Sequence, residues 1–105
     1  MFLLVTDQDG VEHKLEALEG WRAMEVMRDW GMNIRAECGG ACACATCHVF
    51  VDPEWMEKLL PASDEEEAML DTVADTRKNS RLSCQILMRD ELDGLKLELA
   101  PSAAK

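Results

Sequence analysis

Residues 38–48 read CGGACACATCH, and this stretch holds four of the chain's five cysteines. The fifth, Cys84, stands far downstream, so the spacing is Cys38-x5-Cys44-x2-Cys47 with a distant partner. A run of small residues lets the backbone curl closely around a bound group and point its amide N–H groups at it. The stretch therefore indicates a metal cofactor held by thiolates.

The spacing favours iron and sulfide over zinc. Structural zinc sites usually pair their ligands in two CxxC knuckles, and here only Cys44 and Cys47 make one. The plant-type iron-sulfur pattern is C-x4-C-x2-C with a distant fourth cysteine, one residue shorter in its first gap. Starting from Cys42 instead would require a cysteine at Phe50, so that register fails. We predict a 2Fe-2S cluster whose ligands are Cys38, Cys44, Cys47 and Cys84.

The other residues of the stretch suit such a cluster, because its bridging sulfides must be shielded and hydrogen-bonded. Their small side chains leave the backbone N–H groups exposed to the cluster, whereas a zinc ion needs no such surroundings. The predicted backbone donors are Gly39, Gly40, Ala41, Cys42, Ala43, Ala45 and Thr46.

Composition limits the partners. The 105 residues suffice for one compact domain, which we take as residues 1–105, and we expect a monomer. Eleven basic and twenty-one acidic residues give a formal charge of −10, which argues against nucleic acid or an anionic membrane and favours a basic protein partner. The first residues, Met1–Asp7, show neither a signal peptide nor a presequence, and the odd cysteine count suits a reducing compartment. We therefore expect a cytoplasmic protein.

Hydrophobic patterning and turn residues predict strands and helices in one order. Asp9-Gly10 supplies turn chemistry for an opening hairpin, and Ser63 with Glu66 forms a capping-box pattern at the start of an acidic helix. The predicted strands cover residues 2–6, 11–18, 48–51, 81–88 and 95–99, the predicted helices cover 21–30, 55–59 and 63–74, and 101–105 is a polar tail.

Two sequence motifs, CGGACACATCH at 38–48 and SRLSCQI at 80–86, resemble those of the adrenodoxin and putidaredoxin family of ferredoxins. The similarity covers nearly the whole chain. It implies an α+β, β-grasp (ubiquitin-like) fold, in which a mixed sheet carries one main packing helix and a second, acidic helix. It also implies an electron-transfer protein rather than an enzyme, of bacterial origin, that receives electrons from a flavoprotein ferredoxin reductase.

The acidic helix is the candidate docking surface, since family members use it to bind basic patches on their partners. The resemblance assigns this role to Asp64, Glu65, Glu66, Glu67 and Asp71. Projected at 100° per residue, Asp64, Glu67, Asp71 and Asp75 share the face opposite Glu66, Met69, Leu70 and Val73. His48 has two interpretations: it orients the cluster segment by hydrogen-bonding toward the acidic helix, as the family suggests, or it simply begins a strand.

Three functions stay open at this point. The first is electron supply to a cytochrome P-450 type haem-thiolate monooxygenase. The second is electron supply to iron-sulfur cluster assembly, because Cys42 is an additional loop cysteine of the kind that some assembly-type members keep. The third belongs to another class, a zinc-binding interaction module without a redox role.

Overall fold

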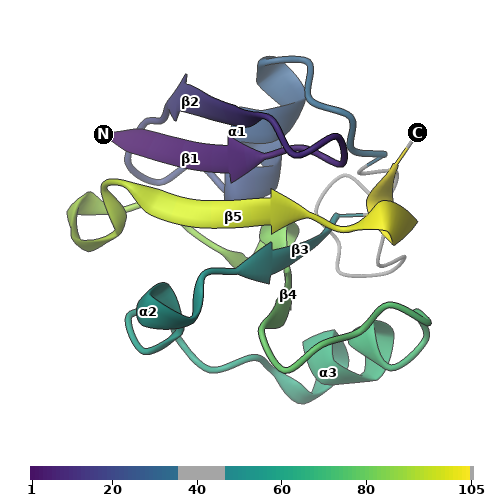
Figure 1. Ribbon diagram of the computed structural model, residues 1–105. Coiled ribbons are helices and arrows are strands. Elements are labelled where there is room, and N and C mark those ends of the chain that lie inside the picture. Colours follow the sequence, from purple (N-terminus) through teal and green to yellow (C-terminus); the bar gives the residue numbers. More distant parts are fainter. Residues whose placement is uncertain (36–46, 105) are drawn as a thin grey trace.

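The computed structural model describes residues 1–35 and 47–104, and its strands form one mixed five-stranded sheet in the order β2-β1-β5-β3-β4. The hairpin β1 (Phe2–Thr6) and β2 (Glu12–Glu16) is antiparallel, and β5 (Leu95–Leu99) pairs with β1 in parallel. On its other side β5 pairs antiparallel with β3 (His48–Val51), which in turn pairs with β4 (Ser80–Leu82). The first and last strands, β1 and β5, thus lie side by side at the centre of the sheet, and the two ends of the chain lie on opposite sides of the molecule (Figure 1). The predicted α+β, β-grasp arrangement is confirmed.

Helix α1 (Ala23–Asp29) packs on one face of the sheet (Figure 1) and buries Ala23, Met24, Val26 and Met27 in the core. Its start is stabilised by Glu25, whose carboxylate accepts the Arg22 N–H at 3.1 Å, and it ends before Gly31, whose φ of 75° suits a residue without a Cβ. The fully buried side chains from the helix and the sheet include Met24, Met27, Leu3, Val5, Leu95 and Leu99. Along β5, Leu95, Leu97 and Leu99 are buried, whereas Lys96 and Glu98 between them are exposed. Apolar and charged residues alternate in this strand because only one face of the sheet is covered.

Two short helices, α2 (Pro53–Met56) and α3 (Asp64–Leu70), lie beyond β3 and β4, on the side away from β1 and β2 (Figure 1). Helix α2 begins where Asp52 accepts the Glu54 N–H at 3.0 Å and Pro53 occupies the first turn. It begins two residues earlier than predicted and ends at Met56, so the predicted end at residue 59 is wrong. Helix α3 begins at Ser63, whose Oγ accepts the Glu66 N–H at 3.2 Å. The prediction that α3 runs to residue 74 is wrong. The hydroxyl of Thr72 donates to the Met69 carbonyl, and that of Thr76 donates to the Leu70 carbonyl, so side chains satisfy the last turn.

The strand predicted over residues 81–88 is also wrong beyond Leu82. The chain turns there into a 3₁₀ helix, η1 (Ser83–Gln85), because the Ser83 N–H and Oγ–H both donate to the Cys47 carbonyl, at 3.0 and 2.8 Å. A further 3₁₀ turn, η2 (Asp90–Leu92), leads into β5. Within residues 1–35 and 47–104, no helix is long and apolar enough to cross a membrane.

The last residues are packed against the fold, which corrects the prediction of a polar tail. Residues Pro101–Ala103 form the 3₁₀ helix η3, and Ala103 is fully buried. The Ala103 carbonyl accepts the Arg35 N–H at 2.9 Å, and the Arg35 guanidinium donates to the Ser102 carbonyl. The end of the chain is therefore attached to the residue that precedes segment 36–46.

Candidate metal centre

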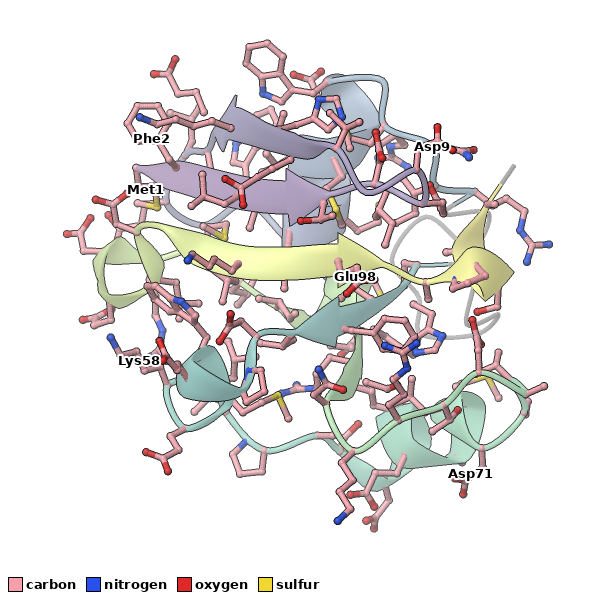
Figure 2. The ribbon with its side chains drawn as sticks, in the orientation of Figure 1. Met1, Phe2, Asp9, Lys58, Asp71 and Glu98 are labelled. Atoms are coloured by element: carbon pink, nitrogen blue, oxygen red, sulfur yellow. The ribbon has the colours of Figure 1, made fainter. Side chains whose placement is uncertain are left out.

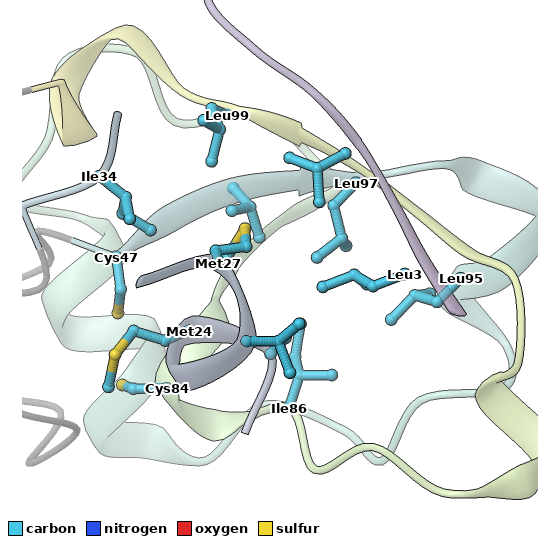
Figure 3. Close-up of a cluster of buried hydrophobic side chains, with 14 of the residues drawn as sticks. Leu3, Met24, Met27, Ile34, Cys47, Cys84, Ile86, Leu95, Leu97 and Leu99 are labelled. Carbon is cyan, nitrogen blue, oxygen red and sulfur yellow. The ribbon is translucent and has the colours of Figure 1, made fainter. Parts of the chain in front are cut away.

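Two of the four predicted ligands, Cys47 and Cys84, lie at one end of the hydrophobic core. Their side chains are 1% and 2% exposed, and both sulfur atoms lie near Met24 (Figure 3). Cys47 stands immediately before β3, and Cys84 lies in η1. The bonds from Ser83 to the Cys47 carbonyl hold these two segments together. A contact between distant parts of the sequence thus brings the two cysteines into one region.

The other predicted ligands, Cys38 and Cys44, lie outside the described residues, as do all of the predicted backbone donors. These are Gly39, Gly40, Ala41, Cys42, Ala43, Ala45 and Thr46. The described residues flanking this segment, Arg35 and Cys47, are both hydrogen-bonded to the fold, Arg35 through η3 and Cys47 through Ser83.

The surroundings of the two cysteines fit thiolate ligands of an iron-sulfur cluster. A buried thiolate without a compensating charge is costly, whereas a metal ion deprotonates the thiol and neutralises it. Gln85 adds a donor at the sulfur itself, since its Nε2 lies 3.4 Å from Cys84 Sγ. Hydrogen bonds of this kind are among the features that set the potential of a cluster.

His48 begins strand β3, and its ring is completely buried. Its Nε2 lies 2.8 Å from Ser80 Oγ, and its Nδ1 lies 3.0 Å from Ser102 Oγ and 3.4 Å from Asp75 Oδ1. The neutral ring satisfies these contacts when Ser80 Oγ–H donates to Nε2 and Nδ1–H donates to Ser102. Burial lowers the pKa of His48, and the opposing effect of Asp75 does not restore it, which favours that neutral form.

Asp75 completes this group of residues, although the helical projection placed it on the outer face of the acidic helix. The helix ends before Asp75, and the carboxylate turns toward η3, where Oδ2 accepts the Ser102 N–H at 3.0 Å. Burial opposes ionisation, yet the hydrogen bonds from Ser102 and the proximity of His48 leave the pKa of Asp75 below its usual value. No pattern in the sequence linked Asp75, Ser80 and Ser102 to His48, because the link depends on where α3 ends.

The acidic helix has two unlike sides. Glu66 is 1% exposed, its carboxylate accepts from Arg81 Nε at 2.6 Å and Nη2 at 3.1 Å, and it also accepts the Leu82 N–H at 2.9 Å. Glu66 therefore does not reach back to Ser63 as the capping-box pattern predicts, and a residue this deeply buried is not available for docking. Both predictions for Glu66 are wrong, because the buried Arg81 in the neighbouring strand β4 binds its carboxylate.

The remaining predicted docking residues lie in solvent. All are exposed, and none forms an ion pair with any of residues 1–35 or 47–104. These residues are Asp64, Glu65, Glu67 and Asp71, the last of which is labelled on α3 in Figure 2. Four carboxylates within eight positions form a strongly negative surface, which we call the outer acidic face of α3.

Known proteins settle the class of the centre. A family model described as the 2Fe-2S iron-sulfur cluster binding domain matches residues 6–89. The chain is a 2Fe-2S ferredoxin. As such it is an electron carrier rather than an enzyme, and the alternative of a zinc-binding interaction module is overturned by the family match.

Two curated relatives and two solved structures place this ferredoxin within its family. It is 55% identical over 91 residues to ferredoxin CarAc of Sphingomonas sp, covering 86% of this chain and 84% of that protein. It is 45% identical over 93 residues to rhodocoxin of Rhodococcus erythropolis, covering 87% of each. A ferredoxin from Rhodopseudomonas palustris aligns with a TM-score of 0.93 at 43% identity, over 96% of this chain and 97% of that one. A reduced variant of putidaredoxin from Pseudomonas putida gives 0.94 at 33% identity, over 98% and 99%. The predicted resemblance to the adrenodoxin and putidaredoxin type is confirmed.

Proposed function

We propose that this ferredoxin carries single electrons from an NAD(P)H-dependent flavoprotein ferredoxin reductase to a cytochrome P-450 type haem-thiolate monooxygenase. The observation that carries the proposal is the outer acidic face of α3, formed by Asp64, Glu65, Glu67 and Asp71. Such a face attracts a basic surface on a partner and orients the encounter. A reductase partner is supported by putidaredoxin solved in a covalent complex with its reductase, which matches 94% of this chain at a TM-score of 0.91 and 36% identity.

The cluster ligands we propose are Cys38, Cys44, Cys47 and Cys84, with the backbone N–H groups of the intervening residues as donors. The bound cluster supplies the one-electron chemistry, and the protein supplies ligation, shielding and docking. In this scheme Cys47 and Cys84 would bind the side of the cluster that faces the hydrophobic core. The buried side chain of Met24, which lies near both sulfurs, would help to exclude water from them (Figure 3). We assign His48 an orienting role, because its ring joins the start of β3 to Ser80 and to Ser102 in η3.

The ligand set is tested by a matched pair of variants. Cys84→Ser is expected to lose the cluster or to bind it weakly, with loss of the visible charge-transfer absorbance. Cys42→Ser is the same cysteine-to-serine change at a residue that we exclude from the ligand set. Its absorption spectrum is therefore expected to match that of the parent. Loss of the cluster in the Cys42 variant would overturn the proposed register.

Iron-sulfur cluster assembly is the second candidate for the electron acceptor. An ISC-like 2Fe-2S ferredoxin from Pseudomonas putida aligns with a TM-score of 0.80 at 28% identity, below the 0.94 and 33% of putidaredoxin. This difference in similarity and the resemblance in the two cysteine motifs both favour the monooxygenase as the first electron acceptor to test.

Reconstitution of the transfer chain tests the whole proposal. The ferredoxin would be mixed anaerobically with NAD(P)H, the reductase of its host and a candidate haem-thiolate monooxygenase under carbon monoxide, and the ferrous-carbonyl absorbance would be followed. The proposal expects formation that depends on the ferredoxin and saturates with its concentration. A ferredoxin that the reductase reduces, but that transfers nothing to the host's monooxygenases while supporting cluster assembly, would give the acceptor role to the second candidate.

A further inference from the structure

The side chain of Gln85 touches a proposed ligand sulfur from outside the segment in which donors to the cluster were predicted. Its Nε2 donates to Cys84 Sγ at 3.4 Å, a distance within the range for a hydrogen bond to sulfur. Cys84 is 2% exposed, whereas Gln85, the next residue, is exposed. An amide group therefore stands between a buried sulfur and solvent.

The local fold holds Gln85 in this position. Ser83 is attached to the Cys47 carbonyl, and the Ile86 N–H donates back to the Ser83 carbonyl at 3.3 Å, closing the turn of η1. Ile86 is buried in the core, so the backbone on both sides of Gln85 is fixed. The fixed backbone therefore keeps the Gln85 side chain next to the sulfur of its neighbour, Cys84.

Gln85 also lies at the wall of a mixed apolar and basic pocket, to which Arg81 and Arg89 contribute. This pocket has a volume of about 190 Å³, and its other walls include Leu59, Leu60, Ile86 and Leu87.

We propose that Gln85 is a positioning residue that raises the reduction potential of the ferredoxin by donating its amide N–H to Cys84 Sγ. Reduction adds one electron, and no covalent bond forms or breaks and no proton is transferred. The added negative charge spreads onto the ligand sulfurs, so a donor at Sγ stabilises the reduced form more than the oxidised form. The inference rests on the proposed ligation by Cys84, which the Cys84→Ser variant tests separately.

This donor differs in kind from the predicted ones. Backbone N–H groups belong to every residue type, so their effect on the potential cannot be removed by changing a side chain. Gln85 acts through its side chain, and an exposed side chain can be replaced without a change in packing. The contribution of this one hydrogen bond is therefore measurable.

The experiment is a redox titration of the holoprotein with Gln85→Met, which keeps the length of the side chain and removes the N–H. Loss of one hydrogen bond to a charged acceptor is expected to lower the equilibrium constant for reduction roughly threefold to tenfold. Tenfold corresponds to about 59 mV for one electron. Gln85→Glu, which also adds a negative charge, is expected to lower the reduction potential further than Gln85→Met does.

Leu87→Met is the matched control, because Leu87 lines the same pocket and is 55% exposed. Its potential is expected to equal that of the parent. A second readout is the shift of the iron–sulfur stretching frequencies on transfer to deuterated water, followed by resonance Raman spectroscopy. Part of that shift should vanish in Gln85→Met and persist in Leu87→Met.

An unchanged potential and an unchanged deuterium shift in Gln85→Met, with the cluster still bound, would overturn the role of Gln85. The same potential change in Gln85→Met and Leu87→Met would also overturn it, since exposure of the pocket would then explain the effect. Neither result would touch the proposed function, because ligation and docking are measured with other variants.

Discussion

Glu66 and Glu67 are neighbours on the same helix, yet the fold uses them in opposite ways. Glu66 is 1% exposed and binds the guanidinium of Arg81 and the N–H of Leu82. Glu67 is exposed and forms no ion pair with any residue that the structure describes. The acidic residues of this helix therefore do not form a single patch. The side of the helix decides whether a carboxylate is buried in the fold or exposed to solvent.

The largest expected effect comes from breaking the buried side. Glu66→Ala leaves the Arg81 guanidinium buried without its counter-charge, and removing one partner of a buried ion pair typically costs about 3–5 kcal/mol. We expect a loss of that size in the free energy of unfolding, measured by urea denaturation of the holoprotein. The double variant Glu66→Met with Arg81→Met should recover much of it, because no charge is then left buried. A loss below about 1 kcal/mol in the single variant would show that water replaces the carboxylate.

A smaller effect is expected from the uncharged part of the buried network. Ser80 Oγ accepts the Arg77 N–H at 2.7 Å and bonds His48 Nε2 at 2.8 Å, and Ser80 is itself buried. Ser80→Ala leaves a ring nitrogen without its partner, which costs about 1–3 kcal/mol of unfolding free energy. Ser63→Ala, which removes only the N-cap of α3, is the control and should cost about 1 kcal/mol. A loss below about 1 kcal/mol in Ser80→Ala would mean that the contacts of its hydroxyl with His48 and Arg77 add no stability.

The exposed side is tested by charge reversal. Asp71→Lys should leave the unfolding midpoint nearly unchanged and raise the apparent KM for the reductase roughly fivefold, a difference of about 1 kcal/mol. Added salt should reduce the difference in apparent KM between the variant and the parent, because salt screens exposed charges. Asp29→Lys changes the net charge by the same amount at the end of α1, and its KM should stay near that of the parent. Equal increases in the two variants would remove the special role of α3.

Asp7 is an intermediate case, partly exposed and paired, and the smallest effect is expected there. Its pKa is lowered, first by the hydrogen bond with His13 at 2.8 Å and then by the Val11 N–H at 3.0 Å. A carboxylate with a lowered pKa stabilises the fold above its unfolded value of about 3.9, and the contribution is lost as the pH falls through the folded value. Asp7→Asn should therefore lower the urea midpoint slightly at neutral pH, with Asp9→Asn as the control from the same turn. A difference between Asp7→Asn and the parent that grew on acidification would contradict this sign.

Local patterns were sufficient for most of the fold. The strands at residues 2–6, 48–51 and 95–99 agree with their predicted bounds, because each apolar run is followed by turn residues. These are the turn 7–10, Asp52-Pro53 and Pro101. The strand predicted over 81–88 is wrong after Leu82, because the bonds from Ser83 to the Cys47 carbonyl connect residues far apart in sequence. No local pattern carries that information.

The site divides in the same way. The cysteine spacing predicted the cofactor, because three of the four proposed ligands are close together in the sequence and their intervals are typical of a 2Fe-2S cluster. The partner of Glu66 was not predictable, because Ser63 and Glu66 satisfy the capping-box pattern whether or not a buried arginine competes for the carboxylate. The hydrogen bond from Gln85 and the contacts of Asp75 were missed for a related reason: each depends on where a helix or turn ends in three dimensions.

The central claim is that the position of a carboxylate on α3, and not the number of acids, controls electron entry. Glu66→Gln and Glu67→Gln each remove one negative charge from adjacent positions, so they form a matched pair for this claim. The measurement is the stopped-flow rate constant for reduction of each folded holoprotein by the reductase at rising ionic strength. We predict that Glu67→Gln slows reduction at low salt and flattens the salt dependence, while Glu66→Gln lowers stability and keeps the rate curve of the parent. Identical slowing in the two variants would contradict the claim, because net charge alone would then control the rate.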